Sequence, residues 1–228
     1  MKERLKNAKG FTLIELAIVL VIIGIILGAI LKGQDLIEGA RAKRLTVNSN
    51  AWSALAWTYV DMKGRFPGDA GRDGIMGNQL TWPSEQTPAA SAIGEMAVAG
   101  AMVSVPENPI NLGGGSYWVY FGYDTVVGGI IKNVMVICKN EACNAVISHD
   151  EKRMLERVDT AIDGRADAGL GQFRAFTGRA LVGGGTINNR HTAVVTSVTA
   201  ANESTAGAPI AWGTGAQHGA VWLFDRPY

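Results

Sequence analysis

The sequence predicts an α+β fold in which one long N-terminal helix packs on a mostly antiparallel β-sheet. Two observations carry this prediction. The stretch from residue 11 to residue 62 contains no proline, so a helix can run through it without a break. Most of the 29 glycines lie after residue 63, where aromatic and β-branched runs alternate with turn residues, as in a sheet-containing domain. The 228 residues suffice for one domain of ordinary size plus an anchor.

The helix begins with an apolar run from Phe11 to Leu31 that only Thr12 and Glu15 interrupt. At about 1.5 Å per residue such a helix spans about 31 Å, which matches the hydrocarbon core of a bilayer. A secretory signal peptide has a shorter apolar region of about 7 to 15 residues and a small-residue cleavage site. Residues 29–33 read AILKG and match that site poorly. We therefore expect a retained membrane helix.

Residues 32–62 extend this helix as an amphipathic half. The apolar side chains of one face recur at i, i+3, i+4 and i+7. They are Trp52, Leu55, Ala56 and Tyr59. Gly64 and the pair Pro67-Gly68 end the pattern. The sequence thus predicts one helix of about fifty residues, far longer than the globular mean of about 11.

Glu15 is the unusual residue of the apolar run. A carboxylate at the centre of a membrane helix costs about 2.5 to 3.5 kcal/mol, and less nearer an interface. One interpretation is that Glu15 reaches the headgroups. The other requires a positive partner at the same depth, which the intact chain lacks. Cutting the chain between Gly10 and Phe11 would create one, because the new α-amino group of Phe11 lies about one turn from Glu15 and within reach of a neighbouring copy.

Residues 9–16 read KGFTLIEL, with a basic leader before them and an apolar helix after them. This stretch resembles the prepilin motif of type IV pilins and type II secretion pseudopilins. In that family a membrane peptidase, whose active site faces the cytoplasm, cuts after the glycine and methylates the new N-terminus. The resemblance implies cleavage between Gly10 and Phe11, N-methylation of Phe11, and Glu15 as the assembly glutamate. Many major pilins carry a proline near the end of the apolar stretch, and residues 29–33 contain none.

The resemblance also orients the chain. Lysines and arginines flank the apolar run on both sides in equal number, so charge alone only mildly favours a cytoplasmic N-terminus. The family has its N-terminus in the cytoplasm. The expected division is therefore a basic prepilin leader (1–10), a transmembrane and filament-core half of the helix (11–31), an amphipathic half (32–62), and a periplasmic or extracellular α+β domain (63–228).

The outer domain is expected to begin with a long connection over residues 63–115, with a short helix over 91–102. An amphipathic helix over 150–162 should be capped by Asp150. The strand candidates are aromatic or β-branched runs bounded by turn residues. They cover 117–123, 134–138, 172–177, 191–199 and 220–224.

The two cysteines, Cys138 and Cys143, enclose four residues. In an exported chain a closely spaced pair suggests a small disulfide loop, whereas in the cytosol the two would be free thiols. The spacing differs from a redox CxxC motif, and no second ligand pair for zinc follows. Because the resemblance implies export, we expect a disulfide.

Catalysis finds no support in the sequence, and we expect no enzyme. No GxSxG, HExxH or P-loop pattern occurs, and the three histidines lie far apart. The net charge of +1 argues against a broad nucleic-acid-binding surface.

Asp159, Asp163 and Asp167 recur every four residues, and calcium prefers several oxygens from one loop. Some pseudopilins bind calcium in their outer domain, which makes Asp163 and Asp167 weak calcium candidates. The stretch lacks the D-x-D-x-[DN]-G order, and a helix end followed by a turn explains it equally well. We therefore expect no metal or other cofactor.

The six tryptophans separate into two groups. Trp52, Trp118 and Trp222 fall in the helix stripe or in strand runs, so core packing is expected for them. Trp82 and Trp212 lie in loop-like sequence and are candidates for contacts with other molecules.

The resemblance implies a structural subunit of a type II secretion pseudopilus or a type IV pilus. The missing proline and the large domain favour a pseudopilin or minor pilin. Its partners would be the prepilin peptidase, copies of itself, other pilin-like subunits and an inner-membrane assembly platform. It would cross the inner membrane once and then enter a periplasmic or extracellular filament. The alternative is a membrane-tethered, non-polymerising periplasmic binding domain that uses Trp82 and Trp212.

Overall fold

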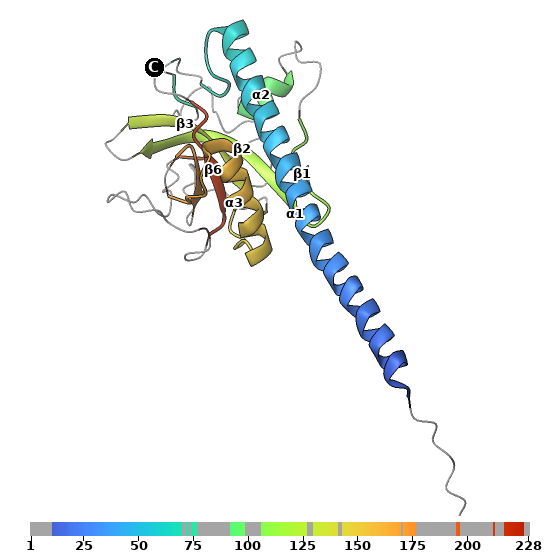
Figure 1. Cartoon of the computed structure of the whole chain (residues 1–228). Coiled ribbons are helices and arrows are strands. Elements are labelled where there is room, and N and C mark those ends of the chain that lie inside the picture. Colours follow the sequence, from blue (N-terminus) through green and yellow to red (C-terminus); the bar gives the residue numbers. More distant parts are fainter. Residues whose placement is uncertain are drawn as a thin grey trace, which may run out of the picture. The chain divides into compact units, whose positions relative to one another are not determined.

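The chain forms two compact units, residues 1–39 and 40–228, in the computed structural model. The structure describes residues 11–69, 72, 74–76, 92–98, 106–126, 130–140, 143–169, 171–176, 195–196, 212 and 217–225. Helix α1 (Leu13–Lys63) is a single helix of 51 residues, drawn in blue to cyan in Figure 1. The predicted helix of about fifty residues is confirmed.

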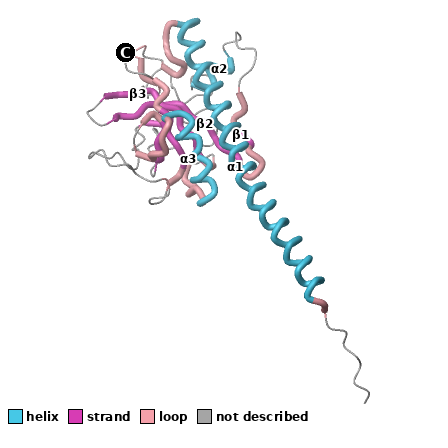
Figure 2. Tube along the Cα trace, in the orientation of Figure 1, coloured by secondary structure: helices cyan, strands magenta, loops and turns pink. Residues whose placement is uncertain are grey.

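The described part of the second unit adds two short helices and a six-stranded sheet to α1 (Figure 2). The helices are α2 (Ala92–Val98) and α3 (His149–Asp163). The strands are β1 (Ile110–Asn111), β2 (Ser116–Val126), β3 (Ile130–Cys138), β4 (Phe173–Phe176), β5 (Val195–Thr196) and β6 (Gly219–Trp222). Their order is β1-β2-β3-β6-β4, with β5 pairing to β2.

The sheet is antiparallel apart from the parallel pairing of β5 with β2. Its centre is the hairpin of β2 and β3, whose register runs from Trp118 opposite Cys138 to Val126 opposite Ile130. The α+β prediction, with a long helix and a mostly antiparallel sheet, is therefore confirmed. Each of the five strand candidates overlaps a strand, and in the range 191–199 the two described residues form β5.

Two local predictions were wrong. Strand β1 lies inside the stretch expected to be a long connection, and a strand of two residues has no periodic signal to detect. The N-cap of α3 is Ser148 rather than Asp150. Ser148 accepts a hydrogen bond from the Glu151 N–H, and the Glu151 carboxylate accepts one from the Ser148 N–H at 2.6 Å. Asp150 instead lies in the first turn, where its charge favours the helix dipole.

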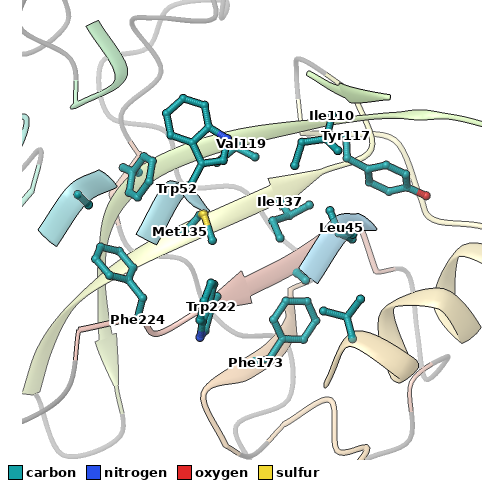
Figure 3. Close-up of a cluster of buried hydrophobic side chains, with 14 of the residues drawn as sticks. Leu45, Trp52, Ile110, Tyr117, Val119, Met135, Ile137, Phe173, Trp222 and Phe224 are labelled. Atoms are coloured by element: carbon teal, nitrogen blue, oxygen red, sulfur yellow. The ribbon is translucent and has the colours of Figure 1, made fainter. Parts of the chain in front are cut away.

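The C-terminal part of α1 buries one face against the sheet, as its spacing predicted. Leu45, Trp52, Ala56 and Tyr59 are buried, and Leu55 packs at the edge of the same cluster. Figure 3 shows Leu45 and Trp52 beside side chains of β2, β3 and β6, with α3 lining the same core. The Trp52 ring meets Phe121 edge to face, with 6.0 Å between centroids.

The opposite face of the sheet is also apolar. Tyr120 and Val134, Val136 and Val221 alternate with the residues that face α1, and they form a second buried cluster. The two faces place the tryptophans of the strands differently. Trp222 is buried in the first cluster, whereas Trp118 packs at the edge of the second.

The end of α1 is held by an ion pair with α2. Gly64 ends the helix at a positive φ of 69°. Glu95 of α2 then accepts two hydrogen bonds from the Arg65 guanidinium, at 2.8 and 2.9 Å, and further bonds from the Gly68 N–H and the Tyr59 hydroxyl. Gly68 has a φ of 74°, and a Cβ there would lie 2.9 Å from the Ala92 nitrogen, so only glycine fits this turn.

Burial alone would raise the pKa of Glu95. The hydrogen bonds from Arg65, Gly68 and Tyr59, together with the positive charge of Arg65, outweigh burial and hold the pKa below its ordinary value. Because this pKa is depressed in the folded state, the pair stabilises the domain above pH about 4.5. That stabilisation is lost as the pH falls through the folded-state pKa.

We expect Glu95→Gln to lower the free energy of unfolding by about 2 to 3 kcal/mol, because it leaves the Arg65 guanidinium without its anion. Urea unfolding of the full-length protein in detergent micelles measures this loss. The matched control is Glu107→Gln. Its pair with Arg44 is 58% and 52% exposed, against 15% and 21% for Glu95 and Arg65. The control should lose less than about 1 kcal/mol. Equal losses in the two variants would contradict this account.

Candidate functional site

The start of α1 holds Glu15 in a capping box with Thr12. The Thr12 N–H and the Thr12 hydroxyl both donate to Glu15 Oε2 at 2.8 Å. The Glu15 N–H in turn donates to Thr12 Oγ1 at 3.3 Å. Thr12 is thus the N-cap and Glu15 is the third residue of the helix, the spacing at which the two side chains satisfy each other's backbone.

This arrangement explains in part how an acid can stand in the apolar run. The carboxylate lies in the first turn, where the helix dipole favours negative charge, and it has local donors before any partner arrives. The pattern T-x-x-E at 12–15 is a sequence signature of a capping box. The sequence could therefore have identified Thr12 as a partner of Glu15, in addition to the lipid headgroups and a positive charge.

Of the residues around the expected cleavage site, Gly10 lies outside the described residues. Phe11 immediately precedes Thr12 and is almost fully exposed. Its backbone nitrogen would become the new N-terminus if the chain were cut there. The structure therefore places Phe11 one residue before the capping box that holds Glu15.

The apolar half of α1 leaves its side chains uncovered within its own unit. Each exposed large apolar residue between Leu13 and Leu31 has at least 47% of its surface accessible. By length and composition α1 can cross a membrane. A helix that is apolar all round is stable only when lipid or other helices surround it.

Three glycines lie on this part of the helix or just after it, and no contact among the described residues requires a glycine there. A Cβ added at Gly24, Gly28 or Gly33 would meet nothing within 4 Å. Gly24 and Gly28 have the small-xxx-small spacing that allows close approach of two membrane helices.

The predicted disulfide between Cys138 and Cys143 is confirmed, with 5.0 Å between the Cα atoms. Both cysteines are buried under the second face of the sheet. Lys139, inside the loop, forms an ion pair of 2.8 Å with Glu151 in the capping box of α3. The loop therefore connects the end of β3 to the start of α3.

Asp159 and the two weak calcium candidates, Asp163 and Asp167, lie at the C-terminal end of α3 and in the turn after it, and each accepts a hydrogen bond from a backbone N–H. Asp159 accepts from the Asp167 N–H, Asp167 from the Gly169 N–H, and Asp163 from two N–H groups at the start of β4. Within the part of the chain that the structure describes, no group of three His, Cys, Asp or Glu is arranged to hold a metal ion.

Trp212 is not a free contact residue, contrary to expectation. Its indole N–H donates to Asp159 Oδ2 at 2.7 Å, and its ring lies 5.9 Å from that of Phe173. Trp82, the other candidate, lies outside the described residues, as does His191. His149 begins α3, and His218 is half-buried just before β6.

One comparison with known proteins gives a match. The prokaryotic N-terminal methylation motif matches residues 5–31, a range that includes the expected cleavage site, Thr12, Glu15 and the apolar half of α1. The chain matches no curated protein and no solved structure. The matched range therefore shows that this chain carries the prepilin-type N-terminal motif of type IV pilins and type II secretion pseudopilins.

Proposed function

We propose that this protein is a structural filament subunit: prepilin peptidase cuts it between Gly10 and Phe11, and residues 11–31 then pack into the filament core. The observation that carries the proposal is the first turn of α1. A carboxylate held by an N-terminal capping box opens an uncovered apolar helix, inside the matched motif. A plain membrane anchor needs neither the acid nor a new amine at Phe11.

The geometry of the capping box leaves one oxygen of Glu15 available. Among the described residues both donors bond to Oε2, and Oε1 accepts no hydrogen bond. Cleavage would create a positively charged amine on Phe11, next to Thr12. That amine, N-methylated, would pair with Oε1 of the same chain or of a neighbour. At about 4 Å and an effective dielectric constant of 20, such a pair gains about 4 kcal/mol, enough to offset the cost of the buried acid.

Packing of the apolar helices would supply the remaining stability of the filament. Inside a membrane the hydrophobic effect favours neither lipid nor helix contacts, so association depends on close packing and on polar pairs. Gly24 and Gly28 allow two helices to approach closely, and the Glu15–Phe11 pair sets their register. The partners are then copies of this chain, other pilin-like subunits and the inner-membrane assembly platform.

Within this class we favour a pseudopilin or a minor pilin. Helix α1 passes residues 29–33 without a proline or a break, unlike many major pilins. The N-terminus would face the cytoplasm before cleavage, and the second unit would lie in the periplasm or outside the cell. The disulfide supports this placement, because such bonds persist in oxidising compartments. The competing idea of a tethered binding domain loses support, since Trp212 packs within its own unit.

We expect Glu15→Val to be cleaved and inserted in the membrane but to fail in assembly, because the Phe11 amine then has no anion in the filament core. Shearing followed by quantification of filaments, with cleavage followed by gel mobility, measures both steps. The matched control is Leu16→Val, which changes an apolar neighbour and should assemble normally. If Glu15→Val assembled as well as the control, the filament proposal would be wrong, and a simple tether would explain the chain.

A second test uses the residue that orients Glu15. Thr12→Val keeps the backbone N–H donor but removes the hydroxyl that donates to Oε2 and caps the Glu15 N–H. Loss of an N-cap costs about 1 kcal/mol, a factor of about five in an equilibrium. We expect a comparable fall in filament yield, and Thr12→Ser, which keeps the hydroxyl, should restore it. Equal yields from the valine and serine variants would show that the capping box has no part in assembly.

A further inference from the structure

The C-terminal end of α3 concentrates negative charge. Asp159 and Asp163 lie four residues apart and so share one face of the helix, and Asp167 follows in the next turn. No basic residue occupies the last turn of α3, where the helix dipole itself favours a cation. Arg165 lies in the turn after α3, and its guanidinium is exposed and bonded to Asp167.

Asp159 is the most deeply buried of the three. Its side chain is fully inaccessible to solvent. Its Oδ2 accepts hydrogen bonds from the Asp167 N–H at 2.6 Å and from the Trp212 indole at 2.7 Å. Its Oδ1 is buried without a partner among the described residues. An ionised carboxylate with one unpaired buried oxygen is strongly disfavoured, whereas a proton on that oxygen converts it to a donor.

Asp163 supplies the acceptor for such a proton. Its Oδ2 is occupied by the N–H groups of Gln172 and Phe173, both at 2.8 Å. Gly171 makes this approach possible, since its φ is 85° and a Cβ there would collide with the Asp163 carboxylate. Asp163 is thus held in place one helical turn after Asp159, where its charge acts on Asp159, and a proton shared by the two carboxyl groups would remove their repulsion.

We propose that Asp159 is a proton switch: a proton on Oδ1, shared with Asp163, relieves the repulsion between the two carboxyl groups, whereas loss of that proton leaves a buried carboxylate that Asp163 repels and that binds the Trp212 indole and the Asp167 N–H more strongly. The groups that act on Asp159 are Asp163 from α3, the Asp167 N–H from the following turn and the indole of Trp212. The neighbouring strand β4 presents the apolar ring of Phe173.

The electrostatics agree with this geometry. Burial raises the pKa of Asp159 to about 7, and the charge of Asp163 adds to the rise, against the opposing bonds from Trp212 and Asp167. The folded-state pKa exceeds the ordinary value near 3.8. The proton therefore stabilises the fold most below that ordinary value, and its contribution is lost as the pH rises towards and through about 7.

The biological meaning rests on the proposed function, which places the second unit outside the cytoplasm. There the cell does not buffer the pH, and a group that titrates near 7 responds to the surroundings. The Trp212 site would then change between acidic and alkaline media while the anchor half of the chain stays the same.

The test is a pH titration of the full-length protein in detergent micelles from pH 5.5 to 8.5, followed by tryptophan fluorescence. The difference between wild type and Trp212→Phe isolates the indole. We expect its signal to change with a midpoint near pH 7. Asp159→Asn, which is neutral at every pH, should abolish the transition. Asp163→Asn removes the like charge and should move the midpoint to lower pH. Asp150→Asn, on the exposed side of α3, is the matched control and should leave the midpoint unchanged.

A second measurement does not depend on the variants folding. With ¹³C-labelled aspartate, one side-chain carboxyl resonance of the wild type should titrate near pH 7. If no resonance does so, or if folded Asp159→Asn keeps the fluorescence transition, the switch is refuted. Neither result depends on assembly, so failure here leaves the filament proposal to the Glu15→Val experiment.

Discussion

Helix α1 meets two different environments within one uninterrupted run of hydrogen bonds, and the rest of the structure follows from that constraint. Between Leu13 and Leu31 the exposed apolar side chains surround the helix, whereas Leu45, Trp52, Ala56 and Tyr59 confine burial to one stripe. The sheet is built to cover that stripe. Its β2 and β3 strands place Val119, Phe121, Met135 and Ile137 on the facing side. Among the described residues of its own unit the apolar half has no such cover, and it needs lipid or other helices.

Three carboxylates show how the chain satisfies negative charge with hydrogen bonds. The Glu15 carboxylate is bonded by a residue close in the sequence, because Thr12, the N-cap of α1, supplies two donors. The Glu95 carboxylate is bonded by a residue distant in the sequence. Arg65 donates two hydrogen bonds to it and so also fixes α2 against the end of α1. Asp159 has donors for one oxygen only. A buried carboxylate whose oxygens are all hydrogen-bonded stabilises one geometry. A buried carboxylate with one oxygen left without a donor favours the protonated form.

Most of the fold could be predicted because its signals are local. A proline-free stretch with an i, i+3, i+4 stripe predicts α1, and aromatic runs between turn residues predict β2 and β3. Strand β1 and the packing of Trp212 escaped prediction because residues outside the local pattern determine them. Strand β1 exists because Ile110 meets Tyr117, and the Asn108 side chain continues that pairing by bonding to both backbone groups of Val119. Trp212 lies in loop-like sequence and is held by Asp159, 53 residues away.

The signals of the candidate site lie closer together in the sequence than those of the domain that follows it. The expected cleavage site, the acid and the apolar span follow one another within residues 10–31, so a single sequence displays them together. What sequence reasoning missed there, the bond from Thr12 to Glu15, is equally local and follows the T-x-x-E pattern. The Asp159 cluster differs, because its three acids look like a helix end or a weak metal site until burial and the orphan oxygen are known.

The match to the methylation motif covers residues 5–31 and so lies within the first unit. In the proposed function a peptidase, a bilayer and a neighbouring helix each require a particular side chain or length within the first unit, which leaves little freedom of sequence. The second unit must only cover the α1 stripe and close a sheet, and many combinations of apolar residues of suitable volume do that. Its polar clusters, Arg65 with Glu95 and Asp159 with Trp212, are then the features through which this subunit would differ from others that share the same N-terminal helix.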